Sequence, residues 1–143
     1  MRKVILMVGA PGSGKSTWVK DHIKDIKEEN RAIVSADHYF EVDGNYVFDR
    51  AKLYMAHQTC QSLYVDALVA GKELVIVDNT NTTARERKFY VEEARSRGYE
   101  VWMDVIKGEA ELCFQRNVHK VPLESIQRMI ARIDVPYGFS EVV

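Results

Sequence analysis

The sequence predicts an α/β fold in which a central, mostly parallel sheet of four or five strands lies between two layers of helices. Three observations support this prediction. Short apolar runs recur along the chain, segments with helical periodicity separate them, and a glycine-rich turn joins the first run to the first helical segment. Because strands and helices alternate, the crossovers favour parallel strands with helices on both faces.

Four short apolar runs are expected to form the strands. They are continuous rather than alternating, which is typical of strands buried on both faces of a parallel sheet. They lie at residues 4–8, 32–34, 74–77 and 101–106.

Four longer segments have the apolar spacing or the end signals of helices, at residues 15–28, 49–70, 84–97 and 123–133. Gly71 and Gly98 are expected to end the second and third of these helices. Thr82 or Thr83 is expected to cap the third, with Glu86 in its first turn. Residues 41–49 predict a small hairpin, and residues 135–143 form a tail to which no element is assigned.

Length and composition predict a single domain over residues 1–143. The chain has 46% hydrophobic residues, and its 20 Lys and Arg against 21 Asp and Glu leave a net charge of -1. This balance argues against a protein that coats nucleic acid by bulk charge, but it allows a local basic groove. Any polyanion site is therefore expected to be focused.

The cysteines and the hydropathy pattern indicate an intracellular protein. Cys60 and Cys113 stand in apolar helical contexts with no metal-binding or redox spacing, so both are expected to be buried thiols in a reducing compartment. No apolar run approaches the ~18 residues of a membrane span. We therefore expect no membrane partner and a cytoplasmic or otherwise intracellular location.

The turn after the first apolar run is GAPGSGKS and fits the phosphate-loop pattern G-x-x-x-x-G-K-[ST]. In such a loop backbone N–H groups surround phosphate oxygens, the lysine reaches the β- and γ-phosphates, and the serine hydroxyl binds Mg²⁺. A dinucleotide fingerprint does not fit, because Thr17 stands where its third glycine is required. A nucleoside triphosphate with Mg²⁺ is therefore the expected ligand, bound by Gly9, Ala10, Pro11, Gly12, Ser13, Gly14, Lys15, Ser16 and Thr17.

Asp37 follows the second predicted strand, in the run SADHYF. Because ligands of open α/β sheets bind beyond the carboxyl ends of the strands, Asp37 is a candidate to accept a proton from an acceptor hydroxyl near the γ-phosphate. The alternative is a turn or helix cap, a common role of aspartate. His38 is expected to be a wall residue or exposed.

The third predicted strand ends in VDNTNTT, a run of short hydrogen-bonding side chains. Asp78 is a candidate to hold Mg²⁺ through water. Asn79, Thr80 and Asn81 are candidates to position substrate or to brace the loop. At least one of these four polar residues is expected to be purely structural.

Arginines near the predicted sheet edge are further candidates. Residues 107–122 predict a lid segment that closes over the triphosphate and brings Arg116 to the transferring phosphoryl group. The alternative is that Arg116 is merely exposed. Arg85, Arg87 and Arg128 are candidates for a rim that contacts a polyanion, although a solvated helix face is the simpler interpretation.

From residue 3 to about residue 133 the sequence resembles the polynucleotide 5′-hydroxyl kinases of the phosphate-loop class. The resemblance rests on GAPGSGKSTW, SADHYF, VDNTNT and QRN with the following VPLESIQRM. It implies a three-layer P-loop kinase fold, with Lys15, Ser16 and Thr17 on the triphosphate and Mg²⁺. It also implies that Asp37 is the general base on the 5′-hydroxyl and that Arg116 contacts the transferred phosphate from the lid.

The sequence departs from the phage-encoded enzyme of this family and looks more like the kinase domains of larger animal proteins, because of DGNYVFD and VDNTNT. The phage enzyme has an arginine, which helps to hold the nucleic-acid phosphate, where this chain has Phe40. Its second, phosphatase domain has no counterpart in this sequence.

The expected function is transfer of the γ-phosphoryl group of Mg-ATP to a 5′-hydroxyl end of DNA or RNA. Two alternatives stay open. One is a P-loop kinase of a small hydroxyl metabolite or nucleoside, which the near-neutral charge and Phe40 favour. The other is a nucleotide-dependent switch or binding module, which the lack of an N-K-x-D motif disfavours for guanine nucleotides.

Overall fold

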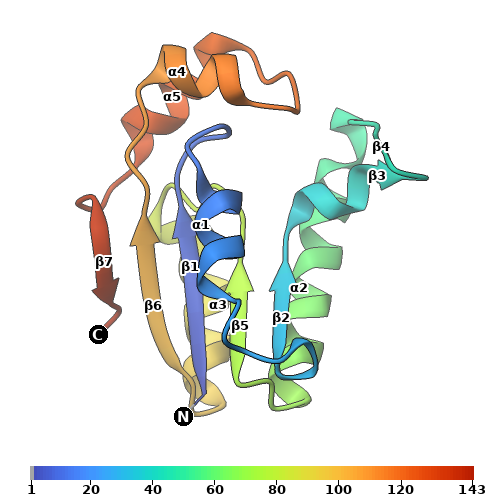
Figure 1. Cartoon of the computed structure of the whole chain (residues 1–143), viewed down its shortest axis with the longest axis vertical. Coiled ribbons are helices and arrows are strands. Elements are labelled where there is room, and N and C mark those ends of the chain that lie inside the picture. Colours follow the sequence, from blue (N-terminus) through green and yellow to red (C-terminus); the bar gives the residue numbers. More distant parts are fainter. Residues whose placement is uncertain (1) are drawn as a thin grey trace.

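A five-stranded sheet forms the middle layer of the computed structural model, which describes residues 2–143 (Figure 1). The strands lie in the order β2-β5-β1-β6-β7. The first four are parallel, and β7 is antiparallel to β6. The predicted mostly parallel sheet is confirmed. The strands are β1 (Lys3–Val8), β2 (Arg31–Val34), β5 (Leu74–Val77), β6 (Glu100–Val105) and β7 (Gly138–Glu141).

Helices cover both faces of the sheet and its carboxyl-terminal edge. α1 (Lys15–His22) lies on one face, and α2 (Leu53–Val69) and α3 (Ala84–Ser96) lie on the other (Figure 1). α4 (Ala110–Arg116) and α5 (Leu123–Arg132) lie above the carboxyl ends of the strands. The resulting three-layer α/β arrangement agrees with the predicted fold class.

The alternation of side chains along β1 explains the two layers. Val4 and Leu6 point to the cluster formed with α2 and α3, whereas Ile5 and Met7 point to the cluster that contains Val19 of α1. Since both faces of β1 are buried, the strand is apolar throughout, as its sequence predicts.

Helix α1 ends earlier than predicted, at His22 rather than at residue 28. The guanidinium of Arg31 donates hydrogen bonds of 2.7 Å to the carbonyl oxygens of both Ile23 and Ile26. These bonds satisfy carbonyl groups beyond the helix end, so the chain turns toward β2 without a further helical turn.

Helix α2 begins later than predicted, at Leu53. A 3-10 turn (Arg50–Lys52) precedes it, and the Asp49 carboxylate accepts the Ala51 N–H at 3.0 Å. The hairpin predicted for residues 41–49 is confirmed as β3 (Glu41–Val42) and β4 (Asn45–Tyr46). Two further 3-10 turns, Glu28–Asn30 and Ala36–Phe40, flank β2.

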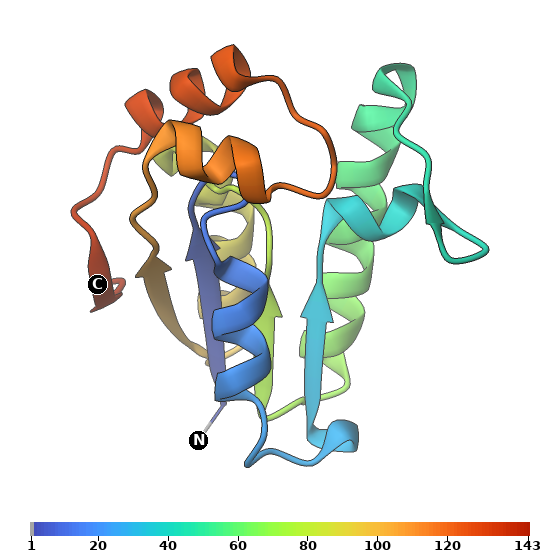
Figure 2. The same ribbon diagram turned by 45° about the horizontal axis from the view of Figure 1, so that its top comes forward.

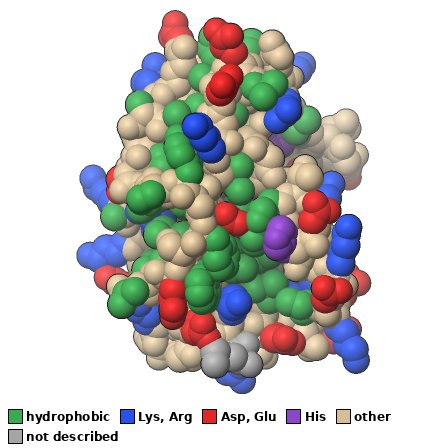
Figure 3. Space-filling view, turned by 60° about the vertical axis from the view of Figure 1, so that its left-hand side comes forward, with side chains coloured by type: hydrophobic (Ala, Val, Ile, Leu, Met, Phe, Trp, Pro, Cys, Tyr) green, Lys and Arg blue, Asp and Glu red, His purple; other side chains and the backbone are tan. Residues whose placement is uncertain are grey.

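Strand β7 lies in the tail to which the sequence assigned no element. All four of its residues are exposed, so no alternating pattern marks it. It extends the sheet by pairing with β6, and the ring of Phe139 stacks on that of Trp102 with 4.8 Å between centroids. Figure 3 shows apolar side chains gathered on the side of the molecule that carries β7, among charged groups.

Both cysteines are free and buried, as predicted. Between residues 2 and 143, no helix is both long enough and apolar enough to cross a membrane.

Candidate functional site

A cavity of about 550 Å³ lies at the carboxyl ends of the parallel strands. Figure 2 shows the chain between α4 and α5 reaching from above the loop after β1 toward the turn after β2. The cavity thus joins segments that are distant in sequence. Its lining residues are Pro11, Gly12, Gly14, Lys15, Ser16, Thr17, Ser35, Asp37, His38, Glu41, Asp78, Asn79, Thr80, Arg116, Asn117, Val118 and His119.

The glycine loop between β1 and α1 forms one wall of this cavity. Gly12 and Gly14 have φ angles of 80° and 105°, which favour glycine. A Cβ atom on Gly12 would overlap the carbonyl oxygen of Cys113, so the loop passes directly beneath α4. In the described part of the chain no side chain caps the N-terminus of α1. The first N–H groups of this helix are therefore available to an anion.

Lys15 is buried in this wall, with 8% of its surface exposed. Its Nζ donates hydrogen bonds of 2.9 Å to the carbonyl oxygens of Gly9 and Ala10. An ammonium has three N–H groups, so one remains for a ligand oxygen. Burial lowers the pKa of Lys15, and the negative charges of Asp78 and Asp37 partly oppose this effect.

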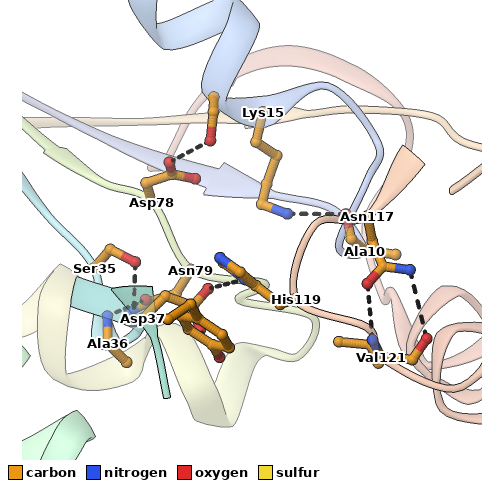
Figure 4. Close-up of polar contacts among 12 residues, drawn as sticks. Ala10, Lys15, Ser35, Ala36, Asp37, Asp78, Asn79, Asn117, His119 and Val121 are labelled. Carbon is orange, nitrogen blue, oxygen red and sulfur yellow. Dashed lines mark hydrogen bonds and ion pairs between the residues drawn. The ribbon is translucent and has the colours of Figure 1, made fainter. Parts of the chain in front are cut away.

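Ser16 and Asp78 provide an oxygen pair at the foot of α1. The Ser16 hydroxyl donates to Oδ2 of Asp78 at 3.3 Å (Figure 4). Burial raises the pKa of Asp78, while the charge of Lys15 and the Ser16 hydrogen bond act to lower it. A hydroxyl and a carboxylate are ligands that Mg²⁺ prefers, and Mg²⁺ takes its other ligands from phosphates and water. These two residues fit a magnesium ion.

Asp37 lies in the 3-10 turn after β2, with its side chain about half exposed at 50%. Ser35, rather than Asp37, caps this turn, because its hydroxyl accepts the Asp37 N–H at 3.2 Å. The Tyr46 hydroxyl donates to Oδ1 of Asp37 at 3.2 Å, and Nδ1 of His119 lies 3.4 Å from Oδ2 (Figure 4). Asp37 is one of the residues that line the cavity.

The contacts of Tyr46 and His119 with Asp37 were not predicted from the sequence. Tyr46 comes from the hairpin and His119 from the chain between α4 and α5, and their rings stack with 3.9 Å between centroids. Burial raises the pKa of Tyr46, and the charge of Asp37 and its hydrogen bond raise it further. The phenol therefore stays protonated and can donate.

Arg116 is the last residue of α4 and is exposed to the same cavity. The loop that follows is shaped by Asn117, whose N–H donates to the carbonyl oxygen of Cys113 at 2.8 Å. The Asn117 side chain accepts the Val121 N–H at 2.8 Å. These bonds define the path of the chain between Arg116 and His119.

The polar run after β5 divides between cavity and scaffold. Asn79 and Thr80 line the cavity, and the Asn79 Oδ1 accepts the Ala36 N–H at 2.8 Å. Asn81 is buried and donates to the carbonyl oxygen of Met7 at 2.8 Å. The prediction that at least one residue of this run is structural agrees with the position of Asn81.

The three predicted rim arginines do not line the cavity. Arg87 is buried, pairs with Asp134 at 2.6 Å and donates to the carbonyl oxygen of Asn81 at 2.7 Å. Arg85 lies in a separate groove on α3, and Arg128 is exposed on α5. Their contact with substrate stays a prediction, for which their positions provide no support.

Three residues of the predicted phosphate loop do not line the cavity with their neighbours: Gly9, Ala10 and Ser13. Gly9 and Ala10 contribute carbonyl oxygens to Lys15.

Phe40, at the position of the phage arginine, is buried with 3% exposure and packs edge-on against Tyr46.

A family model described as an AAA domain matches residues 4–136. NEDD4-binding protein 2 of Homo sapiens is 34% identical over an alignment of 136 positions that covers 89% of this chain. This chain spans only 7% of the length of that relative.

Solved structures of low sequence identity to this chain share its fold, among them an RNA repair complex and an APS kinase. One is the Pnkp1/Rnl/Hen1 RNA repair complex, with a TM-score of 0.73, 19% identity, and coverage of 99% of this chain and 49% of that one. Another is the Mycobacterium tuberculosis APS kinase CysC in complex with AMPPNP and APS. Its TM-score is 0.61 at 17% identity, with coverage of 95% and 82%.

Proposed function

This chain belongs to the AAA_33 family of AAA domains, and we propose that it is an ATP-dependent kinase that phosphorylates the 5′-hydroxyl end of DNA or RNA. Its fold is that of the P-loop kinases. One observation carries the proposal: Asp37 and Arg116 line the same cavity as the phosphate loop. A kinase needs these three elements around one phosphoryl group.

The triphosphate would bind to the loop and to the N-terminus of α1. The free N–H groups of the first turn attract anions, and Lys15 has one N–H left after its bonds to Gly9 and Ala10. Ser16 and Asp78 would hold Mg²⁺, which when bound neutralises negative charge on the phosphates.

Asp37 would act as the general base. As the acceptor oxygen attacks the γ-phosphorus, its proton passes to the Asp37 carboxylate and the bond to the β-phosphate oxygen breaks, which releases ADP. Residues 107–122 would form the lid that brings Arg116 to the oxygens of the transferred group. An arginine in this position is worth roughly 10³ or more in rate.

Two classes of molecule are candidates for the phosphate acceptor. The resemblance to polynucleotide kinases and the similarity to an RNA repair complex support a nucleic-acid end. The burial of Phe40 and the Arg87–Asp134 pair favour a small hydroxyl metabolite or nucleoside, because neither position offers a cation to a nucleic-acid phosphate.

Transfer of labelled phosphate from Mg-ATP to 5′-hydroxyl oligonucleotides of DNA and RNA tests the proposal, alongside a metabolite screen by ATP consumption. Labelling of an oligonucleotide end supports the first acceptor. Consumption with a metabolite alone supports the second, and no transfer to any acceptor contradicts a kinase.

Asp37→Ala should lower transfer by about 10²–10⁴-fold, because the general base is lost. ATP binding, measured by calorimetry, should stay close to that of the unchanged protein. Asp66→Asn, an exposed aspartate on α2, is the matched control and should transfer normally. If Asp37→Ala lost ATP binding to the same extent as phosphate transfer, Asp37 would be assigned to nucleotide binding instead.

A further inference from the structure

We propose that His119 is a positioning residue that orients the Asp37 carboxylate and, through its stack on Tyr46, ties the chain between α4 and α5 to the acceptor side of the cavity. The inference rests on the proposed kinase function and assigns a role to two residues that the sequence motifs do not include.

The first step is the orientation of the carboxylate. Tyr46 donates to Oδ1 of Asp37 at 3.2 Å, while Nδ1 of His119 lies 3.4 Å from Oδ2 (Figure 4). Each oxygen thus has one partner, which restricts rotation of the group. A carboxylate offers about four lone-pair sites, so sites remain for the proton of an acceptor hydroxyl.

The second step is the need for such partners. The Asp37 side chain is 50% exposed, whereas that of His119 is only 24% exposed. A half-exposed side chain on a 3-10 turn would otherwise sample several rotamers, and a general base must hold one geometry. Tyr46 is itself supported from the core, because its ring packs edge-on against the buried Phe40.

The third step is the connection between base and arginine. Arg116 ends α4, and His119 lies three residues further on, within the loop to α5 that Asn117 braces through its bonds to Cys113 and Val121. The stack of His119 on Tyr46, with 3.9 Å between centroids and 13° between ring planes, fixes the middle of this loop beside Asp37. The stack of His119 on Tyr46 therefore helps to set the position of Arg116 relative to Asp37.

Substitutions can separate the two parts of this role. His119→Phe keeps a stacking ring but removes the nitrogen, and Tyr46→Phe keeps the stack but removes the hydroxyl. His119→Ala removes both interactions. His119→Asn restores an amide N–H near the place of Nδ1 without the ring.

We expect kcat for transfer to fall about 10- to 100-fold in His119→Phe, because the Asp37 carboxylate loses one of its two close polar partners. KM for ATP should change less than about 3-fold, because the nucleotide contacts are untouched. His119→Asn should recover a large part of the kcat that His119→Phe loses. His57→Phe, an exposed histidine on α2, is the matched control and should behave as the unchanged protein.

Trypsin cleavage after Lys120, with AMP-PNP bound, reports on the loop without any transfer step. His119→Ala should be cleaved faster than the unchanged protein, whereas His119→Phe should be cleaved at a similar rate because its ring still stacks. Equal cleavage of all three overturns the stacking role.

Undiminished kcat in His119→Phe, in a protein that does transfer phosphate, overturns the positioning role while leaving the proposed function intact. A parallel loss of ATP binding and kcat in His119→Phe overturns it as well. Absence of transfer by the unchanged protein to every acceptor overturns the proposed function, and the positioning role with it.

Discussion

Gly12 illustrates how a single residue sets the geometry of the phosphate loop. It has a φ angle of 80°, and a Cβ atom would overlap the carbonyl oxygen of Cys113. Gly12→Ala should therefore cost about 3 kcal/mol or more, from the backbone strain of roughly 1–2 kcal/mol and from the overlap. Urea unfolding measures the stability, and calorimetry with AMP-PNP should show a loss of affinity because the loop must shift.

Gly44→Ala is the matched control for this change. Gly44 has nearly the same φ angle, 81°, but a Cβ atom there meets nothing within 4 Å. Gly44→Ala should lose only the stability that the backbone strain costs, roughly 1–2 kcal/mol, and should keep its nucleotide affinity. Equal destabilisation of both variants would show that the approach of Cys113 is unimportant.

At the residue scale, the sequence predicts the parts of the site that lie in contiguous motifs. Gly12, Lys15 and Asp78 line the cavity because the loop and the strand ends that carry them are local features. The contact of Tyr46 and His119 with Asp37 joins three separate segments, so no spacing in the chain indicates it. The only local hint is a histidine within the predicted lid segment, residues 107–122.

Asn81 and Arg87 show that residue type and position in the sequence can also suggest a substrate role that the structure does not support. Their types and positions suit a substrate site, yet both are buried and bind the scaffold. Only the fold reveals that the carbonyl oxygen of Met7 and the carboxylate of Asp134 are their partners.

At the scale of elements, the pair between Arg87 and Asp134 joins the segment that follows α5 to the first turn of α3. Asp134 accepts from Arg87 at 2.6 Å and from the Ala84 N–H at 2.7 Å. Burial alone would raise the pKa of Asp134, but these hydrogen bonds and the charge of Arg87 hold it below its ordinary value. The deprotonated carboxylate therefore stabilises the folded protein.

The sign of the pH effect follows from this lowered pKa. The contribution is complete above the unfolded pKa of about 3.9 and is lost as the pH falls through the lower folded value. Asp134→Asn should lower the free energy of unfolding at pH 7 by about 1–2 kcal/mol, the low end for charged hydrogen bonds because Asp134 is partly exposed. Its stability should also fall less than that of the unchanged protein below pH 4, as urea unfolding at several pH values would measure.

Glu92→Gln provides the control for that prediction. Glu92 forms an exposed ion pair with Lys88 on the same helix, so its loss should change stability by less than about 0.5 kcal/mol. An equal effect of Glu92→Gln and Asp134→Asn would contradict a special role for the buried arginine.

The elements themselves were predicted with uneven success, for physical reasons. The strand Leu74–Val77 matches its prediction because a strand buried on both faces must be apolar throughout. The end of α1 was misplaced because Arg31, at the start of the next strand, satisfies the carbonyl groups of Ile23 and Ile26. Strand β7 was missed because its pairing with β6 uses backbone groups and leaves its side chains exposed.

For the whole molecule, binding of nucleotide should couple the loop, the sheet edge and α4 into one more stable unit. A ligand at 100 times its Kd stabilises the folded state by about 2.7 kcal/mol. At roughly 2–4 °C per kcal/mol for a chain of this size, AMP-PNP with Mg²⁺ should raise Tm by about 5–10 °C. Differential scanning fluorimetry measures this shift.

Lys15→Met should abolish most of that increase, because it removes the buried ammonium that would face the phosphates. Lys20→Met is the matched control, since Lys20 is an exposed lysine of the same helix, and it should keep the full shift. An equal shift in both variants would place the nucleotide away from the loop. If the unchanged protein shows no shift at saturating AMP-PNP, the cavity does not bind a nucleoside triphosphate, and the roles of Asp37 and Arg116 in phosphoryl transfer fall with it.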